Sequence, residues 1–79
     1  MANISENDIV EARKKLARRI RQLRKEKGWT QQKLADEADI TMRHVQRLES
    51  TNKTPAIEID SIIRISKAFN ISASSLLKF

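Results

Sequence analysis

Residues that form turns are scarce in this chain, which has one glycine and one proline among 79 residues. A sheet-rich domain needs such residues in its turns and favours β-branched and aromatic residues in its strands. Only three residues are aromatic here, and there is no cysteine for a disulfide or a thiolate metal site. The chain is also about half as long as an average domain. We therefore expect a single, compact all-α domain over residues 1–79.

The chain is strongly basic, with 16 lysines and arginines, 10 acidic residues and a net charge of +6. Such a charge attracts nucleic acid, an anionic membrane surface or an acidic protein. Residues 1–27 carry most of the excess, with 9 basic and 4 acidic side chains. No apolar run approaches the ~20 residues of a membrane span, and the N-terminus lacks the pattern of a secretory signal. We expect a cytoplasmic, nucleoid-associated protein with no membrane partner.

Capping residues divide the chain into five expected helices. Residues 5–8 can cap a long first helix that ends near Gly28. Thr30 and Thr41 are good caps for two short helices, over residues 31–38 and from 42 to about 50. Residues 59–69 and 73–78 complete the set, with Asn70 ending the fourth helix. The apolar positions expected to face the core of the first three helices are Leu16, Ile20, Leu23, Leu34, Ala35, Ala38, Ile40, Val45 and Leu48.

The second and third of these helices have the form of a helix-turn-helix, because each is short, each starts at a threonine cap, and a three-residue turn joins them. The small residue Ala35 stands where the third helix must cross the second closely. The side chains left facing outward near the start and along the third helix are Thr41, Met42, Arg43, His44, Gln46 and Arg47. Groups of this kind can contact base edges in the major groove.

Residues 21–38, RQLRKEKGWTQQKLADEA, and residues 40–50, ITMRHVQRLES, resemble the Xre-type helix-turn-helix family. This family includes the phage Cro proteins, the small phage repressors and the restriction-modification controller proteins. The resemblance covers roughly residues 14–79. It implies a lambda-repressor-like fold of five helices that binds an operator as a dimer.

Three features depart from the family pattern. Asp39 stands at the turn where the family usually has glycine, although aspartate tolerates a left-handed backbone. The loop between Glu49 and Ile59 is longer than the common form. The first helix begins early, so that residues 1–12 form an N-terminal extension of it.

The resemblance implies roles for individual residues on the DNA side. Arg43 and Arg47 can each bond two acceptors on guanine, whereas Met42 offers only an apolar contact, for example to a thymine methyl. Gln31 begins the second helix, where a phosphate can bind against the positive end of the dipole. The complete set of expected DNA contacts is Gln31, Thr41, Met42, Arg43, His44, Gln46, Arg47 and Lys53. Most other basic side chains of the first helix are expected to be solvated.

Other residues have expected structural roles. The resemblance implies a structural ion pair between Arg24 and Glu49, with phosphate contact as a secondary role of Arg24. Trp29 replaces the usual leucine and is expected to pack under the second helix. The last helix is unusually apolar, so that Leu77 and Phe79 are the expected dimer interface. The apolar residues near the N-terminus, Ile4, Ile9 and Val10, are the alternative.

The leading hypothesis is a sequence-specific regulator of transcription that binds a palindromic operator in double-stranded DNA as a homodimer, with its third helix in the major groove. An antitoxin-type module, which sequesters a partner protein and represses its own operon, is the alternative. A role on a membrane surface is disfavoured because the first helix lacks a wide, bulky apolar face. We expect no enzyme, cofactor or metal, since no nucleophile–base pair, glycine-rich loop or metal-ligand spacing occurs.

Overall fold

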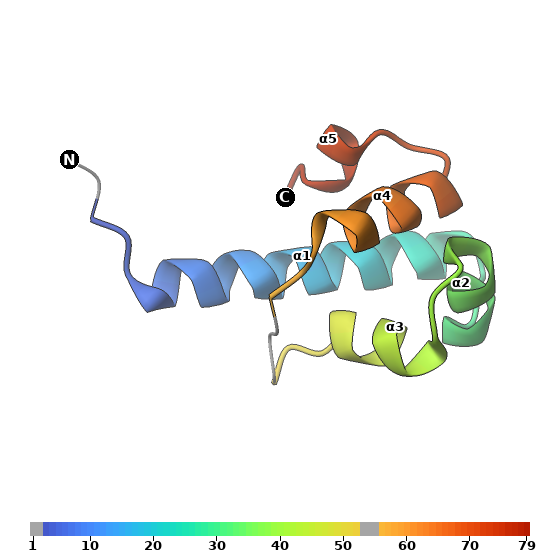
Figure 1. The fold of residues 1–79 in the computed structure, drawn as a ribbon, viewed down its shortest axis with the longest axis horizontal. Coiled ribbons are helices and arrows are strands. Elements are labelled where there is room, and N and C mark those ends of the chain that lie inside the picture. Colours follow the sequence, from blue (N-terminus) through green and yellow to red (C-terminus); the bar gives the residue numbers. More distant parts are fainter. Residues whose placement is uncertain (1–2, 53–55) are drawn as a thin grey trace.

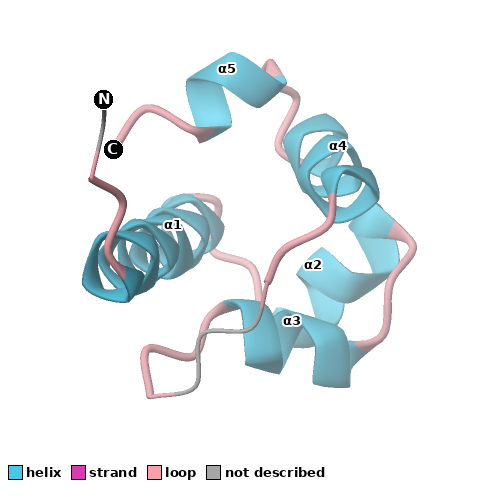
Figure 2. Cartoon of the chain, turned by 60° about the vertical axis from the view of Figure 1, so that its left-hand side comes forward, coloured by secondary structure: helices cyan, strands magenta, loops and turns pink. Residues whose placement is uncertain are grey.

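The computed structural model describes residues 3–52 and 56–79, and this part of the chain contains five helices and no strand. The helices are α1 (Glu6–Glu26), α2 (Gln31–Ala38), α3 (Met42–Leu48), α4 (Ile59–Ala68) and α5 (Ala73–Leu76). Figure 1 shows α1 as a long rod, with the other helices gathered along its C-terminal half. In Figure 2, which looks nearly along α1, the five helices surround a common centre. The expected five-helix, all-α fold is confirmed.

Polar side chains cap the N-termini of four helices, as the sequence predicts. Ser5 and Asp8 form a capping box at α1, in which each side chain accepts a hydrogen bond from the backbone N–H of the other. The hydroxyls of Thr30, Thr41 and Ser72 each accept from the backbone N–H three residues further on, at 3.1, 3.0 and 3.0 Å. Four helix starts are thus stabilised by local bonds.

Among the described residues, three have a left-handed backbone, and each follows a helix: Gly28 (φ +68°), Asp39 (φ +55°) and Asn70 (φ +58°). At Asp39 this conformation lets the chain turn from α2 towards α3. Its carboxylate also lies 3.4 Å from the guanidinium of Arg64 on α4. The turn therefore forms with aspartate in the place of glycine.

Two helices end about two residues earlier than the sequence predicts, and α4 ends one residue earlier, at Ala68. The α3 helix ends at Leu48 rather than near Ser50, and α5 ends at Leu76 rather than at Lys78. The N–H groups of Ser50 and Lys78 each bond to the carbonyl three residues back, at 3.3 and 3.2 Å. Such a bond forms a 3₁₀-type turn, which commonly ends an α-helix. The pattern of apolar residues does not predict it.

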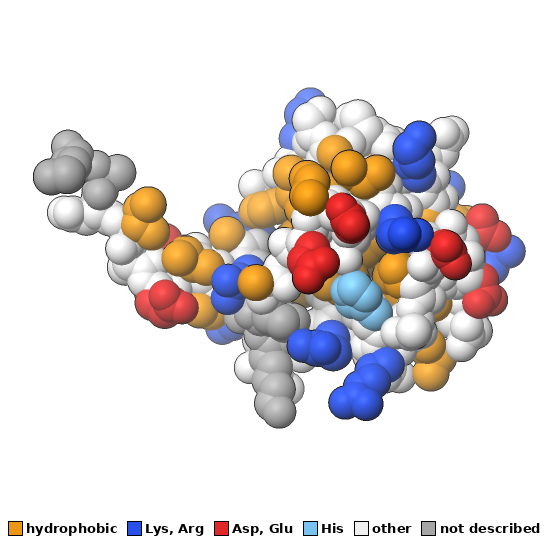
Figure 3. Space-filling model, in the orientation of Figure 1, with side chains coloured by type: hydrophobic (Ala, Val, Ile, Leu, Met, Phe, Trp, Pro, Cys, Tyr) orange, Lys and Arg blue, Asp and Glu red, His pale blue; other side chains and the backbone are white. Residues whose placement is uncertain are grey.

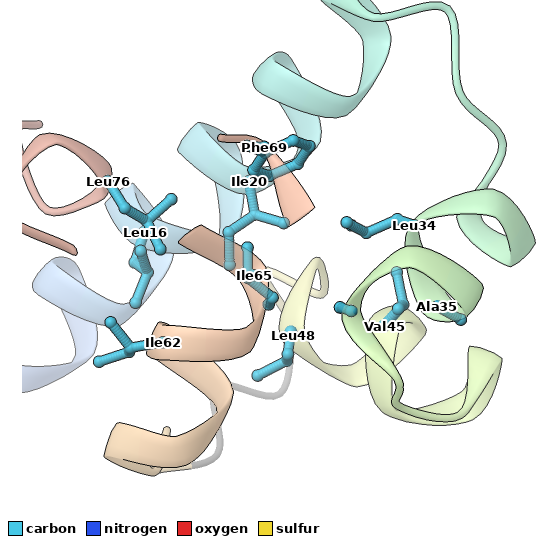
Figure 4. Close-up of a cluster of buried hydrophobic side chains, with 11 residues drawn as sticks. Leu16, Ile20, Leu34, Ala35, Val45, Leu48, Ile62, Ile65, Phe69 and Leu76 are labelled. Atoms are coloured by element: carbon cyan, nitrogen blue, oxygen red, sulfur yellow. The ribbon is translucent and has the colours of Figure 1, made fainter. Parts of the chain in front are cut away.

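The core receives a completely buried side chain from every helix: Ile20 from α1, Leu34 from α2, Val45 from α3, Ile65 from α4 and Leu76 from α5. Figure 4 shows these side chains converging between the helices. The four helices that follow α1 have ten residues or fewer and little stability alone, so this shared burial holds them in place.

Three more apolar residues lie at the rim of the core. Leu23 and Ile40, expected inside, are only partly buried. Trp29 is also half-buried, and its ring stacks on Phe69 with centroids 5.8 Å apart and planes 21° apart. Trp29 therefore packs at the rim of the core, against the C-terminal end of α4.

The α4 helix has two apolar faces and buries only one of them. Ile62, Ile65 and Phe69 belong to the core, whereas Ile59 and Ile63 are exposed. One small core cannot cover both faces.

The N-terminal part of α1 projects beyond the core. Leu16 is the first buried residue of this helix, so that residues 6–15, about 15 Å of helix, precede the core. Figure 1 shows this half of α1 extending away from the other helices, and the longest dimension of the molecule is 41 Å against 24 and 21 Å. We call residues 4–15 the N-terminal arm.

Candidate nucleic-acid interface

The α2 and α3 helices form a closely packed helix-turn-helix. Ala35 is completely buried, and its carbonyl accepts a hydrogen bond of 3.0 Å from the N–H of Ile40 in the turn. Val45 and Leu48 attach the inner side of α3 to the core. Because Ala35 has only a methyl group, the two helices can approach closely, and the orientation of α3 is determined by this packing.

The outer side of α3 carries exposed polar and basic side chains. Arg43 and Arg47 are one helical turn apart, and Met42 and Gln46 occupy the neighbouring outward positions. Thr41 precedes them and is also exposed. The hydroxyl of Thr41 accepts the capping bond of α3, so its own O–H remains a possible donor.

His44 differs from its neighbours because it is partly buried against α4. Its Nε2 atom lies 3.3 Å from the Oγ atom of Ser61, which is a buried residue of α4. His44 is therefore less exposed than its outward spacing on α3 predicts. The cause is the approach of α4 to this side of α3, which the sequence spacing does not reveal.

A hollow of about 310 Å³ lies beside the outer face of α3. Its lining residues are Thr41, Arg43, His44, Arg47, Leu48, Ala56 and Glu58. Figure 3 shows basic side chains projecting next to the single histidine on this edge of the molecule. Among the described lining residues, Glu58 is acidic and Arg43 and Arg47 are basic, so this face suits an anionic partner.

Arg24 and Glu49 come together directly behind this interface. The Nε and Nη2 atoms of Arg24 donate hydrogen bonds of 2.8 and 2.9 Å to the two carboxylate oxygens of Glu49. The side chains are only 11% and 4% exposed. The hydrogen bond to Glu49 raises the pKa of Arg24, because it stabilises the charged guanidinium. A further bond of 2.8 Å, from Nη1 to the carbonyl of Trp29, ties α1 to the start of the helix-turn-helix.

Gln31 lies at the edge of this ion pair and at the first turn of α2. Its Nε2 atom donates a hydrogen bond of 3.4 Å to Glu49, and the side chain is partly buried. The residue expected to contact phosphate thus also helps to connect α2 with the end of α3.

The other expected site residues lie elsewhere. Lys53 is outside the described residues. Leu77 and Phe79 are 42% and 52% exposed. Figures 1 and 2 both place α5 and the C-terminus across the molecule from α3. The expected dimer residues and the outer face of α3 therefore occupy separate surfaces.

Within residues 3–52 and 56–79, no group of histidine and acidic side chains is arranged to hold a metal ion. No helix in the same part of the chain is both long and apolar enough to cross a membrane.

One hydrogen bond between distant parts of the chain could not be predicted from the sequence. Arg19 donates from Nη2 to the carbonyl of Ser75 at 3.1 Å and so connects α1 to α5. These residues are 56 positions apart, and Arg19 is one of many basic residues on α1. No local pattern distinguishes it from its solvated neighbours.

A sequence model of the helix-turn-helix family matches residues 20–76, which include α2, α3 and the Arg24–Glu49 pair. The chain belongs to the Xre-like helix-turn-helix family. The predicted family is thus confirmed by a match that covers more than half of the chain.

Two further comparisons agree with this assignment. The chain is 40% identical over 63 residues to the competence pilus inhibition repressor of Acinetobacter baylyi, a match that covers 77% of this chain. It spans about half, 54%, of the length of that relative. It also resembles the crystal structure of a hypothetical transcription factor, NHTF, from Neisseria, with a TM-score of 0.76 and 27% identity over 98% of this chain and 84% of the other.

Proposed function

We propose that this helix-turn-helix protein represses transcription by binding a palindromic operator in double-stranded DNA as a homodimer. The observation that carries the proposal is the outer face of α3, where Arg43 and Arg47 are exposed one turn apart on a helix whose inner side is in the core. A helix held in this way can enter the major groove and keep its side chains in register with the bases.

The proposed base contacts come from the outward residues of α3. An arginine fork can bond both the O6 and N7 atoms of guanine, and this role is assigned to Arg43 and Arg47. Gln46 can bond the edge of an adenine, and Met42 can contact a thymine methyl. Together these side chains would specify a short half-site.

The proposed phosphate contacts surround α3. Gln31 lies at the N-terminal end of α2, where the helix dipole favours an anion. Thr41 and His44 line the hollow beside α3, and Lys53 follows α3 in the sequence. Contacts to phosphate position the protein without reading the sequence.

The proposed homodimer uses Leu77 and Phe79, which are exposed and lie away from α3. A two-fold dimer of this kind would set the two α3 helices about one turn of DNA, ~34 Å, apart. The chain would act in the cytoplasm, at the nucleoid. Support for repression comes from the relative that is named as a repressor.

Selection of binding sites from a random pool of duplex DNA tests this function. Wild-type protein is expected to enrich a palindrome, and Arg43→Ala is expected to lose the preference at one position in each half-site. Arg21→Ala, which removes a basic residue from the exposed side of α1, is the matched control and should select the wild-type palindrome. Failure to enrich any sequence contradicts the proposal, and recovery of a tightly bound protein instead favours the antitoxin-type alternative.

A further inference from the structure

Opposite charges are separated along one face of α1. Asp8, Glu11, Lys15 and Arg18 follow one another at spacings of three and four residues, so they lie on the same side of the helix. All four are exposed, whereas the core contacts of α1 come from Leu16, Ala17 and Ile20. The two acids precede the two bases, so each α1 has an acidic half and a basic half on this face.

The four charges are arranged symmetrically about position 13. Asp8 and Arg18 are each five residues from it, and Glu11 and Lys15 are each two residues from it. Suppose that two copies of α1 lie antiparallel along this face and are level with each other at position 13. Asp8 of one copy then faces Arg18 of the other, and Glu11 faces Lys15. A two-fold axis makes each of these contacts twice.

The basic half of this face borders a hollow of about 220 Å³. Its lining residues are Lys15, Arg18, Arg19, Gln22, Lys78 and Phe79. Ile4 lies two residues before α1, so the same antiparallel register carries it past the level of Arg18 towards this hollow. Ile4 is 76% exposed in the single chain, and Phe79 is also exposed. The register thus offers an apolar contact beside the ion pairs.

We propose that the N-terminal arm docks on α1 of a second copy, with Asp8 and Glu11 against Arg18 and Lys15 of that copy and with Ile4 in its hollow. The inference deepens the homodimer of the proposed function, because Phe79 belongs to both surfaces. The charged face lies before residue 20, where the family match begins. The arm therefore lies outside the part of the chain that the family model matches.

The ion pair and hydrogen bonds that Glu11 and Asp8 make within one copy do not explain why acidic and basic side chains are separated on this face. Glu11 lies 3.9 Å from Lys14, in an exposed pair of the kind that adds little stability. Asp8 caps α1 through Ser5, but its carboxylate remains exposed and can meet a second cation. Because the proposed contacts form an exposed array, docking should weaken as the salt concentration rises.

Exchange of charges tests the docking. One variant, Asp8→Lys with Glu11→Lys, makes the face wholly basic, and a second, Lys15→Glu with Arg18→Glu, makes it wholly acidic. Each alone should raise the dissociation constant for self-association by roughly thirtyfold or more, measured by sedimentation equilibrium without DNA. An equimolar mixture of the two should recover association, because every basic face then meets an acidic one. The loss of the Asp8 cap cannot be repaired by mixing, so recovery separates docking from damage to the helix.

Arg21→Glu with Lys25→Glu is the control, since it changes the same amount of charge on α1 outside the proposed pairing. It should leave self-association unchanged. The proposal is overturned if wild-type protein is monomeric, if both reversed variants associate like wild type, or if their mixture stays dissociated. Since association is measured without DNA, these results do not depend on operator binding, which is tested separately by site selection.

Discussion

Arg24 and Glu49 are joined by two hydrogen bonds of 2.8 and 2.9 Å, although they are 25 positions apart in the chain. The pair links the last turn of α1 to the end of α3, and Arg24 also bonds the backbone just before α2. One buried ion pair thus holds together the three helices that determine where the DNA-binding face lies.

Removal of either Arg24 or Glu49 should destabilise the fold. Arg24→Ala and Glu49→Ala are each expected to lower the free energy of unfolding by about 3 kcal/mol, because each leaves a buried charge unpaired. The double variant should lose less than the sum of the two. Glu37→Ala, which breaks the exposed pair with Lys33, is the control and should cost less than about 1 kcal/mol. Denaturant unfolding measures all four variants, and additive losses would show that Arg24 and Glu49 do not interact.

The same pair predicts a pH dependence. A group whose pKa is raised on folding contributes stability below its unfolded pKa and loses it as the pH rises through the folded pKa. The pKa of Arg24 is raised from an already high ordinary value. Its contribution should therefore persist through the neutral and mildly alkaline range. A double-variant cycle repeated at pH 7 and pH 10 should give the same coupling of Arg24 to Glu49, and a marked loss at pH 10 would contradict this.

Arg43 and Gln31 should differ in what they contribute to DNA binding. Arg43→Ala is expected to relax the choice of base at one position per half-site, with a cost of roughly 1–3 kcal/mol for the preferred site. Gln31→Ala should weaken binding to all sequences about equally, because its proposed contact is to phosphate. Site selection and fluorescence anisotropy check both variants. An unchanged sequence preference of Arg43→Ala would show that this residue does not read bases.

Ala35 should tolerate no larger side chain. Ala35→Leu is expected to destabilise the fold by about 1–3 kcal/mol and to abolish DNA binding, because the extra atoms separate α3 from α2. Ala12→Leu places the same side chain on an exposed position of the N-terminal arm and should leave both stability and DNA binding nearly unchanged. Thermal unfolding and anisotropy measure the two effects, and normal operator binding by Ala35→Leu would refute the close crossing.

The left-handed backbone at Asp39 predicts different results for two substitutions. Asp39→Ala should lower the free energy of unfolding by about 1 kcal/mol, because alanine is strained at φ +55°. Asp39→Gly removes the carboxylate that lies beside Arg64 but relieves the backbone, so it should be at least as stable as wild type. If both variants lose stability equally, the carboxylate and not the backbone is the important feature of this turn.

Leu77 should contribute to the contact between two copies of the chain. Leu77→Glu is expected to shift the protein towards monomers, because it places a charge in the proposed dimer surface. Met42→Glu changes a side chain of similar exposure on the DNA face and should leave the oligomeric state unchanged. Sedimentation measures both. If Leu77→Glu keeps the wild-type dissociation constant, the C-terminal surface is not the interface.

Local chemistry in the sequence determined the helices of this protein. Thr30 and Thr41 specify where α2 and α3 begin, since each caps a backbone N–H only three residues away. Asp39 tolerates the left-handed turn between them, and the small side chain of Ala35 permits the crossing. These features depend on residues near one another in the chain, so the family and the all-helical fold could be predicted from sequence.

Contacts between distant residues were decided only by the tertiary structure. His44 has the spacing of an outward residue on α3, yet α4 brings Ser61 to 3.3 Å from its ring. Arg19 resembles every other basic residue of α1 until the chain folds back and places the carbonyl of Ser75 beside it. Such contacts follow from the way the shared core orients α4 and α5 against α1 and α3. The pattern of residues within a single helix contains no information about that orientation.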